Sequence, residues 1–202
     1  MEIVVATGNK GKLKEIKAGI ALYAPDLTCI SMTELASIYG DPPEVAETED
    51  TYIGNATLKA EAIFEWSKGE RIVLSDDAGI EVDALGRKPG VFTARYRSPS
   101  NPSLVTVDAV IHDIEGVVNR KATMISVIVI KFPDGKVISS RAELPGRLTT
   151  IRSDSAEGFG FDPWFITDGE AVTNADIKKE RGATFLTHRL KALKDILLKL
   201  GV

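Results

Sequence analysis

Apolar residues recur along the chain at two spacings, one typical of strands and one typical of helices. Glu2 to Ala6 is a short apolar run with strand character, and Lys12 to Tyr23 repeats apolar side chains at helical spacing. A polar turn that contains glycine, Thr7 to Gly11, separates the two. The chain is therefore expected to open with a strand, a loop and a helix.

The same patterns predict the elements that follow. Further strands are expected at Leu27–Ser31, Arg71–Leu74, Ala122–Phe132, Lys136–Ala142 and Leu144–Thr150. Helices are expected from Thr51 to about Lys68, over Leu104–Ile114, and from Thr187 to the end. Pro133-Asp134-Gly135 is a turn signal, so the strands beside it form a hairpin. Strands alternating with helices and then a hairpin predict an α/β fold with a mixed sheet, which we expect to form one domain over residues 1–202.

Two adjacent acids, Asp76 and Asp77, follow the apolar run that ends at Leu74. Successive strand side chains point to opposite faces, so one acid can face a cleft while the other meets a structural partner. Carboxylate oxygens suit Mg²⁺, which proteins hold with one or two carboxylates and substrate phosphates. An Asp-Asp pair after a strand also occurs as a simple polar turn, so this pair alone decides nothing.

The turn after the first strand has the properties of an anion site. Amide groups at a helix N-terminus, the helix dipole and nearby ammonium groups favour a polyanion such as triphosphate. Loops of this composition also start ordinary helices, and the spacing is not that of a P-loop. The residues concerned are Thr7, Gly8, Asn9, Lys10, Gly11 and Lys12.

Two later segments carry candidate chemistry. Aromatic residues alternate with glycine from Glu157 to Phe165, which favours either a stacking surface for a flat base or core packing. Thr187-His188-Arg189 opens the last helix, where such residues also serve as caps.

Composition narrows the class of protein. The 202 residues are 44% hydrophobic and 27% charged with a net charge of −4, which argues against a broad nucleic-acid-binding surface. The single cysteine, Cys29, excludes an internal disulfide framework. The N-terminal residues lack a signal-peptide pattern, and no apolar run approaches eighteen residues. We expect a cytosolic protein without a membrane partner.

Four separated motifs together resemble the inosine/xanthosine triphosphate pyrophosphatase family. They are ATGNKGKLKE, SDDAGIEVDALGRKPGVFTARY, GFGFDPWF and THRLKAL, and they stand in the family's order over nearly the whole chain. The resemblance implies an elongated, two-lobed α/β fold with a central cleft, a homodimer, and Mg²⁺ as cofactor. It also implies hydrolysis of ITP, dITP and XTP to the monophosphate and pyrophosphate.

The resemblance assigns roles residue by residue. Thr7 to Lys12 hold the triphosphate, and Asp77 is both a metal ligand and the catalytic base. Glu47 is the second metal ligand, because it stands four residues before Thr51, with Glu44 as the alternative. The residues expected to contact the nucleotide and its base are Ala78, Phe159, Gly160, Phe161, Asp162, His188 and Arg189.

Three positions depart from the family pattern. Ala78 replaces a serine, Gly54 a glutamate, and Ala183 a lysine that binds substrate, a role that Lys179 or Arg181 can take over. The departures leave two alternatives open. One is a nucleotide-binding regulatory protein of the same fold with little turnover, and the other is a pyrophosphatase with a different base preference.

Overall fold

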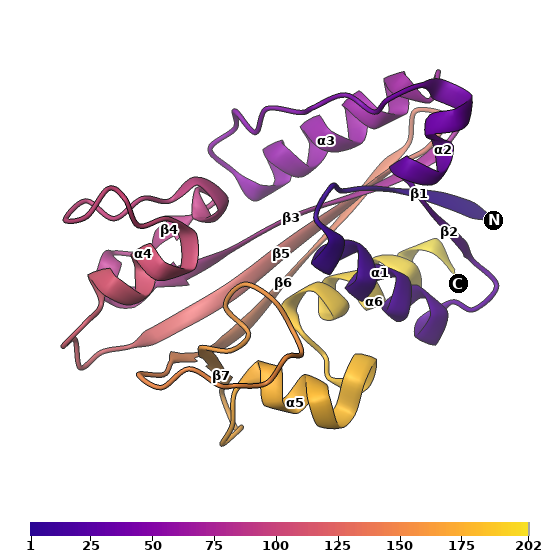
Figure 1. Ribbon diagram of the computed structural model, residues 1–202. Coiled ribbons are helices and arrows are strands. Elements are labelled where there is room, and N and C mark those ends of the chain that lie inside the picture. The colour runs from indigo at the N-terminus through magenta and orange to yellow at the C-terminus, as the bar shows by residue number, and fades with distance from the viewer. Residues whose placement is uncertain (202) are drawn as a thin grey trace. The chain divides into compact units, whose positions relative to one another are not determined.

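The computed structural model describes residues 1–201, and the chain divides into two compact units. Unit 1 comprises Met1–Asp77, Ser126–Ala142 and the segment from Arg189 onward, and unit 2 comprises Ala78–Ile125 and Glu143–His188. The sheet is mixed, with strand order β2-β1-β3-β5-β6-β7 and β4 paired to β3 (Figure 1). A mixed α/β fold is therefore confirmed.

Unit 1 begins as the sequence predicts. The elements that it contains wholly or in part are β1 (Glu2–Ala6), α1 (Lys10–Tyr23), β2 (Thr28–Ser31), α2 (Met32–Tyr39), α3 (Tyr52–Trp66), β3 (Ile72–Val82), β5 (Lys121–Lys131), β6 (Val137–Leu148) and α6 (His188–Leu200). Strand β1 pairs in parallel with β2 and with β3, and its residues Ile3, Val4 and Val5 are fully buried. A fully buried parallel strand explains the unbroken apolar run at the N-terminus.

Helices cover both faces of the sheet in unit 1. Helix α3 lies on one side of β3, and α1 and α6 lie together on the other (Figure 1). The contact between α1 and α6 depends on Gly19, because a Cβ there would come within 2.6 Å of the side chains of Leu190 and Leu193. The hydroxyl of Ser140 on β6 donates a hydrogen bond to the carbonyl of Ala192, which ties α6 to the sheet.

Unit 2 is built around its own apolar core. Its elements are the last part of β3, β4 (Lys88–Gly90), α4 (Thr106–Asp113), the first part of β5, the end of β6, β7 (Phe165–Thr167) and α5 (Asn174–Arg181). The core contains Ile80 and Val82 from β3, Leu144 and Leu148 from β6, and Phe165 from β7. His112 on α4 is exposed.

The extent of β3 corrects one prediction. The strand does not end at Leu74 but runs for 11 residues, so Asp76 and Asp77 lie within it and not in a polar turn. Both are buried, with 1% and 3% of their surface exposed. Charged side chains tolerate such burial only when oppositely charged groups meet them, and the sequence pattern around β3 does not show those partners.

Other boundaries also differ from the predicted ones. Helix α1 starts at Lys10 instead of Lys12, because Asn9 caps it. The two strands expected at Lys136–Ala142 and Leu144–Thr150 are one strand, β6. Helices α2 and α5 are eight residues long, and their short patterns predicted no helix. Within residues 1–201, no helix has the length and apolar composition needed to cross a membrane.

Candidate functional site

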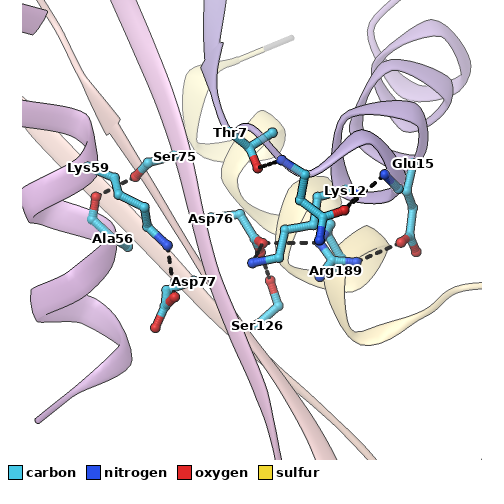
Figure 2. A network of polar contacts seen from close by, with 12 residues as sticks. Thr7, Lys12, Glu15, Ala56, Lys59, Ser75, Asp76, Asp77, Ser126 and Arg189 are labelled. Atoms are coloured by element: carbon cyan, nitrogen blue, oxygen red, sulfur yellow. Dashed lines mark hydrogen bonds and ion pairs between the residues drawn. The ribbon is translucent and has the colours of Figure 1, made fainter. Parts of the chain in front are cut away.

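The two acids of β3 point to opposite faces of the sheet in unit 1 (Figure 2). Asp76 faces α1 and α6, where it meets Lys12 and Arg189. Asp77 faces α3, where it meets Lys59. The strand alternation expected from the sequence therefore holds, and it separates two charge clusters with different partners.

Asp76 is the centre of a buried ion network. Its Oδ2 lies 2.8 Å from Lys12 Nζ and 3.2 Å from Arg189 Nε, and its Oδ1 accepts a hydrogen bond from Ser126 Oγ at 2.6 Å. Arg189 Nη1 lies 2.6 Å from Glu15 Oε2. Although burial disfavours the charged carboxylate, Arg189 and Lys12 hold the pKa of Asp76 well below its ordinary value. Asp76 therefore remains charged and joins α1 to α6 through Lys12 and Arg189.

Asp77 belongs to the second cluster, which contains Lys59 and Glu47. Lys59 Nζ lies 2.8 Å from Asp77 Oδ1 and 2.8 Å from Glu47 Oε1, so one ammonium group joins both carboxylates. Burial raises the pKa of Asp77, although Lys59 acts in the opposite direction. Burial also disfavours the charged form of Lys59, but Asp77 and Glu47 outweigh it and raise the pKa of Lys59.

The acidic segment before α3 is fixed by the start of that helix. Asn55 is fully buried and makes two hydrogen bonds with the backbone of Glu49. The Asn55 Oδ1 atom accepts from the Glu49 N–H at 3.0 Å, and the Asn55 side-chain amide donates to the Glu49 carbonyl at 3.2 Å. A Cβ at Gly54 would come within 2.7 Å of Glu49 Cβ. The glycine that replaces the expected glutamate thus lets this segment lie close against α3. Glu47 is half-buried beside Lys59, whereas Glu44 is exposed.

The Asp77 and Glu47 carboxylates fit a divalent cation. Asp77 Oδ2 is buried and has no hydrogen-bond partner among residues 1–201, so it is an acceptor that a cation can satisfy. No group of three or more His, Cys, Asp or Glu side chains in that range is arranged to hold a metal by itself. Two carboxylates alone match the way in which Mg²⁺ is held, since waters and substrate phosphates complete its shell.

The loop before α1 is more ordered than its composition suggests. Asn9 Oδ1 accepts hydrogen bonds from the amides of Gly11 and Lys12, at 2.9 and 3.1 Å, and the amide of Asn9 donates to Thr7 Oγ1. These three amides were expected to face an anion, but they are engaged within the loop. Gly8 and Lys10 are exposed. Exposed Lys10 and the α1 N-terminus still present positive charge at this point.

In unit 2, the two phenylalanines of the GFGFDPWF motif have different environments. Phe161 is 5% exposed and packs in the core of unit 2, whereas Phe159 is half-buried. Phe159 is therefore the ring that can present a face to a base. Asp162 is buried, and its Oδ2 accepts a hydrogen bond from the Phe159 amide at 2.8 Å. Gly160 has a φ of 59°, a conformation that favours glycine.

The other predicted contacts are distributed over both units. Ala78 and His188 belong to unit 2, where Ala78 is half-buried and His188 is 4% exposed. Arg189, in unit 1, is 2% exposed and engaged with Asp76 and Glu15. The contacts of Ala78, His188 and Arg189 with a nucleotide stay predictions.

Comparison with known proteins identifies the family. Residues 3–199 match the sequence profile of the Ham1 family. The chain belongs to the Ham1 family. The dITP/XTP pyrophosphatase of Deinococcus deserti is 36% identical over 193 residues, covering 95% of this chain and 86% of that protein. The dITP/XTP pyrophosphatase of Shouchella clausii is 33% identical over 194 residues, covering 95% and 92%.

Solved structures of the Ham1 family share the fold. The Ham1 protein of Staphylococcus aureus superposes with a TM-score of 0.78 at 28% identity, covering all of this chain and 98% of that one. The Ham1 protein of Coxiella burnetii also has a TM-score of 0.78, at 26% identity. The resemblance drawn from the four motifs is thereby confirmed.

Sequence reasoning missed the residue that joins the two carboxylates in this Ham1-family protein. Lys59 follows Asn55 by four residues on α3, so the two share a helix face, and this spacing was the available signal. Glu15 was missed for a different reason. Its partner Arg189 is 174 residues away in the sequence, which no local pattern reveals.

Proposed function

We propose that this protein hydrolyses non-standard purine nucleoside triphosphates (ITP, dITP and XTP) to the monophosphate and pyrophosphate. Membership of the Ham1 family supports the proposal, as do the names of its dITP/XTP pyrophosphatase relatives. The observation that carries it is the cluster of Glu47, Lys59 and Asp77, in which a buried carboxylate oxygen has no partner among residues 1–201. Such a cluster suits attack of water on a phosphoanhydride held with a divalent cation.

In this proposal Asp77 acts as the general base. Burial raises its pKa, and a more basic carboxylate removes a proton from water more readily. Lys59 holds the Asp77 carboxylate through Oδ1, which leaves Oδ2 for a ligand. Glu47 and Asp77 would hold Mg²⁺, which when bound neutralises phosphate charge and lowers the pKa of a bound water.

The remaining proposed roles concern binding. The loop from Thr7 to Lys12 and the exposed ammonium of Lys10 would bind the triphosphate, and Lys12 is held in place by Asp76. In unit 2, Phe159 would stack on the base, with Gly160, Asp162 and His188 contributing polar contacts and Ala78 lining the nucleotide. We further propose a homodimer, which the resemblance to the family implies, and a location in the cytoplasm.

The assignment of Glu47 in preference to Glu44 gives a direct test. We expect Glu47→Gln to raise the Mg²⁺ concentration for half-maximal activity by about tenfold or more, because one of two carboxylate ligands loses its charge. Glu44→Gln is the matched control, since Glu44 is exposed and stands three residues away. A Mg²⁺ titration of both variants decides the matter, and a larger shift in Glu44→Gln would reverse the assignment.

A panel of nucleoside triphosphates tests the function itself. The wild-type protein is incubated with ITP, XTP, ATP, GTP and pyrimidine triphosphates, with and without Mg²⁺, and pyrophosphate and orthophosphate are assayed separately. We expect pyrophosphate from ITP and XTP in the presence of Mg²⁺. Thermal stabilisation by ITP without product would instead favour the regulatory alternative, and pyrophosphate from another base would favour the alternative specificity.

A further inference from the structure

One lysine of α5 reaches the loop that carries Phe159. Lys178 Nζ lies 2.9 Å from Asp162 Oδ2 and 5.4 Å from the centroid of the Phe159 ring, all within unit 2. Of the two residues that can replace the lysine absent at Ala183, Lys179 is exposed and Arg181 pairs with Glu170 at 2.8 Å. Lys178 was not among the sequence candidates, yet its ammonium lies beside both Phe159 and Asp162.

Asp162 is held in a defined orientation by this contact. Its Oδ2 accepts from the Phe159 amide and faces the Lys178 ammonium, while its backbone carbonyl accepts from the Ala175 amide at 3.1 Å. Gly158 permits the arrangement, because a Cβ there would come within 2.7 Å of Asp162 Cβ. One side of the carboxylate is thus fully engaged.

The other carboxylate oxygen of Asp162, Oδ1, is not engaged in the same way. Asp162 Oδ1 is buried and has no hydrogen-bond partner among residues 1–201. A charged, buried acceptor of this kind calls for an N–H donor. A 6-oxopurine offers an N1–H, whereas the N1 of adenine has no proton and would place two acceptors face to face.

The ammonium of Lys178 also contacts the ring of Phe159. It lies within the range of a cation–π contact with Phe159, so it covers part of one face of the ring. Both groups of the proposed base subsite are therefore oriented by the same side chain, which is only 14% exposed.

We propose that Lys178 is a positioning residue for base recognition, which holds Asp162 with its free oxygen toward the N1–H of a 6-oxopurine and fixes the Phe159 ring. The proposal rests on the proposed function, because the base subsite is that of the pyrophosphatase. Lys178 acts through Asp162 and Phe159 and takes no part in the chemical step.

The test separates base recognition from catalysis. We expect Lys178→Met to raise the KM for ITP by about tenfold or more with kcat changed less than about threefold, because the charge-assisted contact that is lost serves the base and not the reacting phosphates. Lys178→Arg keeps the charge and should stay within about threefold of wild type in both constants. Lys121→Met, at an exposed lysine of unit 2 with no proposed role in the site, is the matched control and should change neither.

Binding of inosine monophosphate, measured by calorimetry without Mg²⁺, tests the same residue independently of turnover. We expect Lys178→Met to weaken this binding by a similar factor. Should Lys178→Met fail to fold, Lys178→Gln replaces it and is compared with Lys178→Arg. Equal affinities for inosine monophosphate in wild type and the neutral variant, or a wild type that does not bind it, would overturn the role of Lys178. A wild type that binds it but releases no pyrophosphate from any triphosphate would overturn the proposed function alone.

Discussion

Replacing Asp77 by asparagine is expected to lower kcat for Mg²⁺-dependent ITP hydrolysis by about 10³-fold or more. The substitution removes a general base, whose loss typically costs 10²–10⁴-fold, and also one of two charged ligands for the cation. The side chains are nearly the same size, and an amide keeps one oxygen to face Lys59, so the fold should persist. Steady-state kinetics and the thermal unfolding midpoint measure the two effects separately.

The matched control for this substitution is Asp83→Asn. Asp83 is exposed in the turn that follows β3 and lies six residues after Asp77. We expect kcat within about twofold of wild type for this variant, because surface substitutions have small effects. Near-normal turnover in Asp77→Asn would contradict the role assigned to Asp77, whatever the control shows.

Replacing Arg189 by methionine is expected to destabilise the folded protein by about 3–5 kcal/mol. Arg189 is 2% exposed and lies between Asp76 and Glu15, so its removal leaves two carboxylates without their shared cation. Truncation of one partner of a buried ion pair has this cost, even where the intact pair adds little net stability. Urea unfolding of wild type and variant at pH 7 gives the difference in free energy.

Arg181→Met provides the comparison with an exposed ion pair. The Arg181 side chain is 50% exposed and pairs with Glu170 at 2.8 Å, close to the distance in the buried network. We expect this variant to lose less than about 1 kcal/mol, because solvent screens exposed pairs. If both arginine variants lost the same small amount, the network around Asp76 would not be a structural element of unit 1.

The network around Asp76 also shows why local sequence patterns predicted only part of the site. The order of strands and helices followed from periodicity, and strand alternation correctly placed Asp76 and Asp77 on opposite faces. Periodicity did not predict the full length of β3. Two adjacent acids have the pattern of a turn, unless the cationic side chains that pair with them are known. The cation Lys12 lies on α1, and Arg189 lies on α6. Arg189 is 113 residues from Asp76 in the sequence.

The aromatic loop shows a second limit of sequence reasoning. Phe159 and Phe161 are two residues apart and chemically identical, so composition could not tell which one is half-buried and which one packs in the core. Lys178 gave no signal either, since it is one of three neighbouring basic positions on α5. Its partner Asp162 lies on a loop whose path depends on tertiary packing and not on local preference.

The position of bond cleavage is the most direct measure of the proposed chemistry. Wild-type protein is incubated with ITP and Mg²⁺ in water enriched in ¹⁸O, and the products are identified by ³¹P NMR. Attack of water on the α-phosphorus predicts inosine monophosphate that carries the label, together with unlabelled pyrophosphate and no orthophosphate. Inosine diphosphate with labelled orthophosphate, or no product at all, would contradict a pyrophosphatase built on Asp77 and Glu47.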